Sequence, residues 1–214
     1  MENMQVLALA ASALVAATAA PNLQNVILKP AQVGKGYGVY ARTDGFGVKA
    51  APTLDLCGRT GYPSEKKRVD RLQVNYLKVK EAIGLSNEVV RYKPGGAKQA
   101  LSEVLRHART CPRTPIETGE AGIGKLRFTI TPLHDSKLLK GAVAVRVRAV
   151  GKLKNGKHVD QTSYAVYQVL GDVLSGVYSF GPNTAAQQAF ALHAAEQSAK
   201  ALQKQVSKPS GPPA

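Results

Sequence analysis

The chain has 214 residues, a formal net charge of +15, two cysteines and four histidines. This length is enough for one domain with a hydrophobic core, and the positive charge favours encounters with polyanions. The cysteines and histidines show no C-x-x-C or H-x-x-x-H spacing, which argues against a metal site, and we expect no cofactor.

An uncharged run lies near the start of the chain, from Val6 to Ala20. It is about 15 residues long, shorter than the roughly 20 that a membrane-spanning helix needs. Ala17-Thr18-Ala19 gives the small-x-small pattern of a signal-peptidase site. We therefore predict a signal peptide over residues 1–19 and a protein that is secreted or associated with the cell envelope. The alternative is an alanine-rich first helix that packs on the domain.

Cys57 and Cys111 form the one possible pair of cysteines. In an exported protein the default for such a pair is a disulfide, which here would close a loop of about 55 residues. The chain-entropy model gives such a loop roughly 4 kcal/mol of stabilisation as an upper figure. Two buried thiols are the alternative.

Residues 30–63 are rich in Gly, Pro and Thr and indicate loops with short extended pieces at Val39–Arg42 and Thr53–Leu56. The segment Arg68–Val79 alternates apolar and polar residues, which is typical of a half-buried strand. We expect a break at Ile83-Gly84. The apolar members of the strand are Leu72, Val74 and Tyr76, and the polar members are Arg71, Gln73 and Asn75.

A second strand, Ser86–Lys93, is followed by Pro94-Gly95-Gly96 and then by a change of hydrophobic period. From Ala97 to Cys111 apolar residues recur at helical spacing, so we predict a helix that Pro112 ends. The disulfide would then join the end of this helix to the loop at Cys57. The predicted apolar face of the helix carries Ala97, Leu101, Val104, Leu105, Ala108 and Cys111.

Two long strands, Ala142–Leu153 and Val159–Leu170, flank Asn155-Gly156, a dipeptide that suits a two-residue type I′ hairpin turn. Gly171-Asp172 makes a second tight turn, so Val173–Phe180 completes an antiparallel meander. Counting outward from the first turn pairs Val147 with Tyr164, Val145 with Val166, Arg146 with Ala165 and Arg148 with Ser163. Counting across the second turn pairs Val166 with Val177 and Ala165 with Tyr178.

Residues 112–125 indicate a loop, and Leu126–Thr131 indicates a strand that ends at Pro132. The last element is a long helix that begins with a capping box, Thr184-x-x-Gln187, and a disordered tail follows at 207–214. Its apolar stripe is mostly alanine, which favours packing on a sheet over the alternative of a coiled coil. The stripe consists of Ala185, Ala189, Leu192, Ala195, Ala199, Leu202 and Val206.

The order of these elements is strands, helix, four strands, helix, with no repeat or internal linker. It predicts a single α+β domain over residues 20–206. We expect a twisted, mainly antiparallel sheet that is flanked by two helices.

Four segments together resemble a known family: Thr53–Gly58, Tyr62–Glu65, Leu85–Tyr92 and Gly95–Pro112. The pattern resembles a family of actinobacterial exported proteins, many of them predicted lipoproteins without an assigned function. The layout is also similar, more distantly, to the extracellular sensor domain of mycobacterial receptor Ser/Thr kinases. The resemblance covers roughly residues 28–200.

The resemblance implies a twisted antiparallel sheet with flanking helices, a cleft for an unidentified ligand, and a disulfide between Cys57 and Cys111. This chain departs from the kinase sensors because it has one cysteine pair where they have two, and it carries no kinase domain. It departs from the lipoprotein relatives because it has no lipobox cysteine. The shared pattern contains no catalytic motif, so it implies a binding domain and not an enzyme.

Two groups of residues suggest catalysis only weakly. His134-Asp135-Ser136 holds the residue types of a hydrolase triad, but neighbours in sequence cannot adopt the triad geometry, and we expect a turn. Glu117 and Glu120 could pair as acid and base, although surface charge is the simpler interpretation.

One face of the predicted sheet is the best candidate for a ligand surface. With the strand pairing given above, Arg146, Arg148, Tyr167 and Tyr178 alternate onto this face, and Arg127 is a candidate to join them. Arginines beside aromatic rings suit an anionic or planar ligand. A solvated face with packed arginine stems is the alternative.

We therefore expect a secreted, non-catalytic, sensor-like domain that binds a small anionic or envelope-derived ligand in a cleft between sheet and helix. One alternative is a basic structural or adhesion protein that binds an anionic envelope polymer, and another is a small secreted hydrolase. No specific nucleic-acid partner is expected, because the sequence contains no recognised module that interleaves basic and aromatic residues. We expect a monomer without a transmembrane segment.

Overall fold

The computed structural model describes residues 22–44, 51–112, 114–117, 123–181 and 185–206. The predicted signal peptide and the predicted tail lie outside the described residues, as do Glu120 and Thr184. None of the helices within the described ranges is long and apolar enough to cross a membrane.

The described strands form one eight-stranded sheet in the order β1-β2-β3-β8-β7-β6-β5-β4, and each neighbouring pair is antiparallel. The strands are β1 Gly38–Asp44, β2 Arg68–Lys78, β3 Ile83–Tyr92, β4 Ile116–Glu117, β5 Ile123–Leu133, β6 Val143–Leu153, β7 His158–Leu170 and β8 Val173–Phe180. The helices are α1 Pro30–Val33, α2 Gly96–Thr110 and α3 Ala185–Val206, with short 3-10 helices η1 Leu23–Asn25, η3 Leu56–Gly58, η4 Pro63–Lys67 and η5 Val79–Glu81. The predicted α+β class is confirmed.

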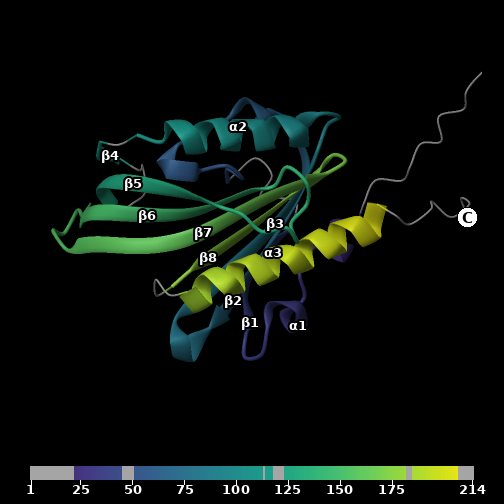
Figure 1. Ribbon diagram of the computed structural model, residues 1–214, viewed down its shortest axis with the longest axis horizontal. Helices are drawn as coiled ribbons and strands as arrows, with labels where there is room; N and C mark the ends of the chain where they lie inside the picture. Colours follow the sequence, from purple (N-terminus) through teal and green to yellow (C-terminus); the bar gives the residue numbers. More distant parts are fainter. Residues whose placement is uncertain (1–21, 45–50, 113, 118–122, 182–184, 207–214) are drawn as a thin grey trace, which may run out of the picture.

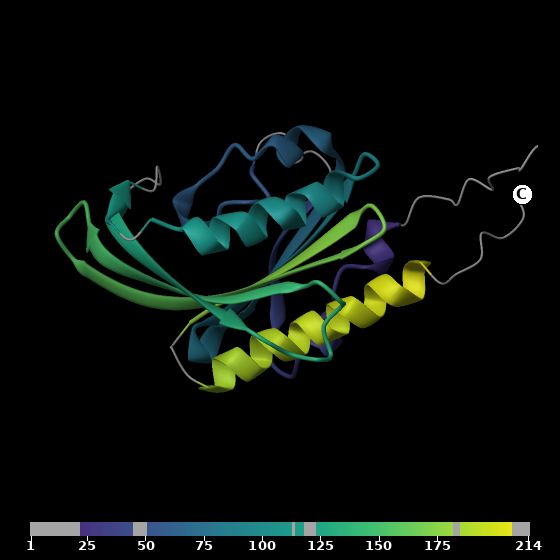
Figure 2. The same cartoon turned by 45° about the horizontal axis from the view of Figure 1, so that its top comes forward.

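The two long helices lie on opposite faces of the strongly twisted sheet, as Figures 1 and 2 show. One hydrophobic cluster, which includes Val145 and Leu174, lies on the side of α2. A second cluster, which includes Val166 and Val177, lies on the side of α3. We call these sides the α2 face and the α3 face. Both faces of the central strands are covered, which explains why these strands are apolar on both sides.

Helix α3 packs on β7 and β8, which confirms that its alanine-rich side lies against the sheet. The buried stripe differs from the predicted one at its start, because Ala189 is exposed and Ala191 is buried. A buried hydrogen bond between Ser175 and Ser198, with the two hydroxyl oxygens 2.6 Å apart, joins the helix to β8. Small side chains therefore let the helix approach the sheet closely.

The buried side of α2 differs from the predicted apolar face. Ala97 and Val104 are buried as expected, but Leu105 is 40% exposed. Glu103 and His107 are buried in its place. The reason is that η3 and η4 pack along this side of the helix and supply polar partners that helical periodicity does not reveal.

Several element boundaries also differ from the sequence analysis. β3 begins at Ile83, where a break was predicted, and Thr53–Leu56 contains no strand. β4 lies inside the predicted loop 112–125, and β5 continues through Pro132. A proline is tolerated there because β4 pairs with β5 at the other end of the strand, so Pro132 occupies an edge.

The β6–β7 hairpin has a different turn from the predicted one. The loop contains three residues, Lys154–Gly156, since the Leu153 amide donates to the Lys157 carbonyl at 2.8 Å. Gly156 has φ +85° and is the one residue of the loop with a positive φ. This is a three-residue loop with a left-handed glycine, so the two-residue type I′ turn is wrong.

The longer loop displaces the β6–β7 pairing by one residue. Arg146 lies opposite Tyr164 and Val145 lies opposite Ala165. The predicted pairs Val147–Tyr164, Val145–Val166, Arg146–Ala165 and Arg148–Ser163 are therefore wrong. The predicted pairs across the second turn, Val166–Val177 and Ala165–Tyr178, are confirmed.

Candidate functional site

The five residues of the predicted ligand surface do not share a face. Tyr167 and Tyr178 lie on the α2 face, with ring centroids 5.5 Å apart and an angle of 70° between the ring planes. Arg146 and Arg148 on β6 lie on the α3 face, and Arg127 on β5 lies on the same face. The one-residue change in pairing produces this separation, because it moves every side chain of a strand to the other face. A single site made of these five side chains is therefore excluded.

The three arginines form an exposed basic surface on the α3 face. Arg148 makes two hydrogen bonds to Asp160, at 2.8 and 2.5 Å, and these bonds hold the pKa of Asp160 below its usual range. Arg146 donates to the Thr131 hydroxyl at 3.4 Å. Arg127 is exposed. Because Asp160 offsets the charge of Arg148, Arg127 and Arg146 dominate this surface.

A cleft of about 780 Å³ lies on the α2 face, between the sheet and the segment that runs from Pro52 to Thr60. This volume is within the range of pockets that hold small ligands. Helix α2 contributes none of the lining residues, so the cleft lies between sheet and loop instead of between sheet and helix. One wall is apolar and includes Leu126, Phe128, Val147 and Ala165. The other is polar and includes Gln73, Asn75 and Ser86, while Ser163 lies beside Val147 on the neighbouring strand.

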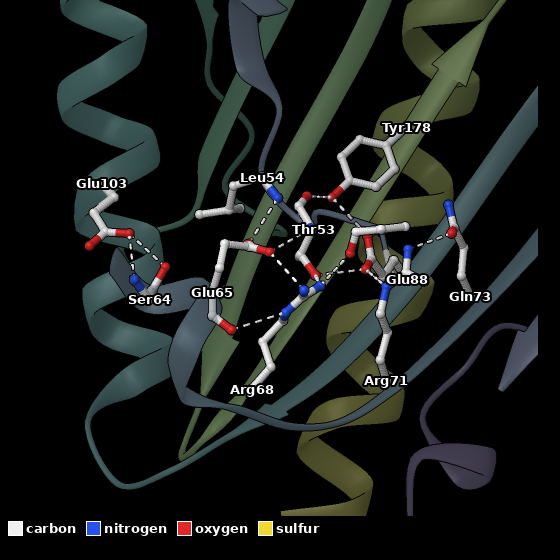
Figure 3. A network of polar contacts seen from close by, with 11 residues as sticks. Thr53, Leu54, Ser64, Glu65, Arg68, Arg71, Gln73, Glu88, Glu103 and Tyr178 are labelled. Carbon is white, nitrogen blue, oxygen red and sulfur yellow. Dashed lines mark hydrogen bonds and ion pairs between the residues drawn. The ribbon is translucent and has the colours of Figure 1, made fainter. Parts of the chain in front are cut away.

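A buried ion pair between Arg71 and Glu88 lies at the polar end of the cleft (Figure 3). The two side chains are 3% and 2% exposed. Arg71 also donates to the Gln73 side-chain oxygen at 2.7 Å, and Gln73 donates to the Ser86 hydroxyl at 2.8 Å. This chain of hydrogen bonds orients the two lining side chains, Gln73 and Ser86.

Glu88 has further partners on both sides of the cleft. The Thr53 hydroxyl donates to it at 2.8 Å, and the Tyr178 hydroxyl lies 3.5 Å from its other oxygen. Burial raises the pKa of Glu88, although Arg71 and Thr53 act to lower it. Burial also raises the pKa of Tyr178, so its hydroxyl stays protonated. The Tyr178 hydroxyl also lies 3.4 Å from the Thr53 carbonyl oxygen. Since both contacts are long for hydrogen bonds, this hydroxyl can turn to a ligand.

The segment that forms the outer wall of the cleft is held by charged side chains (Figure 3). Arg68 donates to the Ala51 carbonyl at 2.7 Å and to the Thr53 hydroxyl at 3.0 Å. Glu65 accepts from the backbone amides of Thr53 and Leu54 at 3.1 and 3.2 Å. Such charge-assisted bonds are among the stronger hydrogen bonds in proteins, so the wall is preorganised.

The disulfide between Cys57 and Cys111 is confirmed, with the two Cα atoms 6.1 Å apart. It ties η3 to the C-terminal end of α2. Cys57 lines the cleft, and its φ of +58° lies in the left-handed region, which is uncommon for a residue other than glycine. A position of this kind persists where surrounding structure holds it, and here the bridge does so.

The site offers binding groups but no recognisable catalytic arrangement. The acids that line the cleft are Asp55 and Glu88, and its lining includes no lysine or arginine. Within the described residues, no group of three His, Cys, Asp or Glu side chains is placed to hold a metal. His134–Ser136 leads into a turn in which Asp135 accepts from the Lys137 amide at 2.9 Å.

Glu88 was not among the predicted site residues, although its sequence context contains a signal. Glu88 is an acid inside an otherwise apolar strand, directly before Val89-Val90. Arg71, on the preceding strand, was predicted to lie on the polar side of that strand. This side is the α2 face in the structure. The burial of Glu88 under the segment at Thr53 has no local signal in the sequence, because the contact between Glu88 and Thr53 joins residues far apart along the chain.

The sequence matches no protein-family model and no curated protein. Among solved structures, it is similar to the extracellular domain of PknH from Mycobacterium tuberculosis, with a TM-score of 0.54 and 10% identity. The match covers 83% of this chain and 94% of that one. The two share a fold. The distant resemblance to the extracellular domains of mycobacterial receptor kinases is thus confirmed, at the level of architecture.

Proposed function

We propose that this protein is an exported, non-catalytic, sensor-like domain whose ligand occupies the cleft on the α2 face. The observation that carries the proposal is the cleft itself, about 780 Å³ in volume, with one apolar wall and one preorganised polar wall. The predicted signal peptide supports export, as does a fold shared with an extracellular domain.

The lining favours an uncharged, amphiphilic ligand derived from the envelope. Amide and hydroxyl side chains such as Gln73 and Ser163 both donate and accept hydrogen bonds, as sugar or peptide groups require. The apolar wall suits an alkyl or ring portion. An anionic group in the cleft would instead meet Asp55 and Glu88 with no lysine or arginine in the lining.

Native mass spectrometry of the protein purified from its own host tests this proposal. We expect an adduct that leaves on denaturation, on a polypeptide that begins at Ala20. Ser163→Trp would fill the cleft and should abolish the adduct. Thr129→Trp is the matched control, because Thr129 is exposed on the α3 face of β5. A wild-type protein without adduct, or equal adducts in both variants, would contradict ligand binding in the cleft.

The basic surface supports a second candidate function, the binding of an anionic envelope polymer on the α3 face. Arg127 and Arg146 would carry it, since both are exposed and, among the described residues, neither pairs with a carboxylate as Arg148 does. Polyglutamate is a suitable probe. Arg127→Ala and Arg146→Ala should weaken its binding more than Arg148→Ala. Equal effects of the three variants would indicate a response to net charge alone.

A further inference from the structure

A second cavity, of about 170 Å³, lies between α2 and the segment that joins η3 to η4. It shares no lining residue with the cleft. Six side chains that carry polar groups line it: Arg59, Tyr62, Glu103, Arg106, His107 and Thr110. The cavity is therefore a separate polar site.

Two polar atoms of this cavity are buried without a hydrogen-bond partner in the part of the chain that the structure describes, the Tyr62 hydroxyl and His107 Nε2. Tyr62 is 5% exposed and His107 is 6% exposed. Their rings meet edge to face, with centroids 5.8 Å apart. Buried polar groups in proteins are nearly always paired, because an unpaired group loses its hydration without compensation. Two such atoms in one cavity indicate that it receives a polar group.

The state of His107 defines what that group must offer. A backbone hydrogen bond from the ring to Leu56 falls on Nδ1, since Nε2 has no partner. Burial, followed by the charge of Arg59, lowers the pKa of His107, so the imidazole is neutral at neutral pH. Nε2 then carries a lone pair and acts as an acceptor. A matching ligand must bring a hydrogen-bond donor.

The acid of the cavity is already satisfied. The Glu103 carboxylate accepts from the Ser64 amide at 3.3 Å and from the Ser64 hydroxyl at 2.6 Å, as Figure 3 shows. Its second oxygen accepts from Gln99 at 2.7 Å. It therefore has no need of a cationic ligand.

Two guanidinium groups complete the lining. Arg59 and Arg106 are both exposed side chains at the cavity, and the Arg59 guanidinium carbon lies 5.8 Å from the centroid of the Tyr62 ring. Together with the Tyr62 hydroxyl they offer several donors to an anion. The cavity thus combines donors for anionic oxygens with one neutral acceptor.

We propose that this cavity binds a phosphate group that retains a proton, either free or at the end of a larger molecule. Its anionic oxygens accept from Arg59, Arg106 and Tyr62, and its remaining O–H donates to His107 Nε2. The volume suits a phosphate group, and it is below that of pockets for drug-sized ligands. This site is independent of the ligand in the cleft.

The neutral acceptor predicts a choice between two similar anions. Phosphate keeps at least one proton at neutral pH, and sulfate keeps none. Sulfate has no O–H to donate, so it would leave His107 Nε2 unpaired. Isothermal titration of the intact, disulfide-bonded protein at constant ionic strength should therefore show one saturable phosphate site, with sulfate at least about tenfold weaker.

Two tyrosine variants test the assignment. Tyr62→Phe should weaken phosphate binding about tenfold or more, because it removes one donor to the anion. The matched control is Tyr92→Phe, since the Tyr92 hydroxyl is also buried without a partner but lies outside the cavity. Tyr92→Phe should leave phosphate binding unchanged. Thermal melts of the ligand-free variants should show that both fold as well as wild type, because each loses an unpaired hydroxyl.

A comparison of inorganic phosphate with sn-glycerol 3-phosphate at pH 6, where about half of a phosphate monoester still keeps a proton, distinguishes the two sources of the phosphate group. Tighter binding than inorganic phosphate would indicate the terminal group of a larger molecule, and weaker binding would indicate the free ion. The proposal is overturned if phosphate fails to bind, if sulfate binds equally well, or if Tyr62→Phe leaves the phosphate affinity unchanged.

Discussion

At the scale of single residues, the buried Arg71–Glu88 pair holds the polar wall of the cleft. Glu88→Gln would leave the Arg71 guanidinium buried without its counter-ion. Removal of one member of a buried ion pair costs about 3–5 kcal/mol. We therefore expect a loss of that order in the free energy of unfolding, measured by urea denaturation at neutral pH.

The double variant Arg71→Met/Glu88→Met separates the pair from its isolated charge. Because it removes both charged groups together, its loss of stability should be smaller than the summed losses of Arg71→Met and Glu88→Met. Additive effects would show that the two side chains do not interact as the structure indicates.

His107 gives the protein a stability that depends on pH. Burial and Arg59 lower its pKa in the folded state, so between the folded and unfolded pKa values the unfolded chain binds more protons. The free energy of unfolding should then fall as the pH drops below about 6.5, by at most about 1.4 kcal/mol per pH unit for one group. His107→Gln should flatten this profile.

Urea denaturation in phosphate-free buffer between pH 5 and 7.5 measures the effect of His107. His193→Gln is the control, since His193 is exposed on α3. The same slope in wild type and His107→Gln would refute a contribution from the buried imidazole.

Residue-level prediction succeeded where a pattern is local. Leu72, Val74 and Tyr76 are all buried on one side of β2, as their alternation indicated. Glu103 and His107 were placed outside the apolar face of α2, and both are buried. Their partners, Ser64 and Leu56, lie far along the chain, and the helix sequence alone contains no trace of them.

At the scale of elements, one turn decided the outcome for the predicted ligand surface. The strands of the hairpin were placed correctly, but Asn155-Gly156 was assigned to a two-residue loop. The actual loop includes Lys154, and the Asn155 side chain accepts from the Lys157 amide at 3.1 Å. Both turns suit an Asn-Gly dipeptide, so local chemistry could not separate them. The one-residue difference in the β6–β7 pairing places the arginines on the α3 face and the tyrosines on the α2 face.

The disulfide joins η3, which lines the cleft, to the end of α2, which lines the second cavity. Its loss should lower the stability of the fold. Cys57 and Cys111 are separated by 54 residues, for which the chain-entropy model gives about 4 kcal/mol. Cys57→Ser/Cys111→Ser should lower the free energy of unfolding by up to that amount. Wild-type protein in reducing agent should behave in the same way, and an unchanged melting temperature in both would contradict the prediction.

A companion variant isolates the backbone strain at Cys57. With the bridge absent from both proteins, Cys57→Gly/Cys111→Ser should be more stable than Cys57→Ser/Cys111→Ser by about 1 kcal/mol, because glycine adopts a positive φ without steric cost. The two proteins are compared by urea denaturation. Equal stabilities would mean that this segment relaxes to another conformation once the bridge is lost.

At the scale of the whole molecule, the β3–β8 pairing joins the two halves of the sheet. Strands β1 to β3 precede α2, and β8 is the last strand of the chain, yet β8 lies between β3 and β7. The sequence patterns predicted the strands and the α+β class, because alternation and turns are local. They did not predict this strand order, because its contacts join residues about 90 positions apart, such as Asn87 and Gly176.

The central position of β3 and β8 predicts a gradient of local stability across the sheet. Buried, doubly paired strands open only with the global unfolding of a domain, whereas edge strands open locally. We expect amide hydrogens of β3 and β8 to exchange most slowly, and those of β1 and β4 most rapidly, in hydrogen-exchange mass spectrometry. Reduction of the disulfide should speed exchange at η3 and at the end of α2, while α3, on the opposite face, keeps its protection. Equal acceleration in α3 would show that the two faces of the sheet unfold as one unit. The two proposed sites on the side of α2 could then not open without α3.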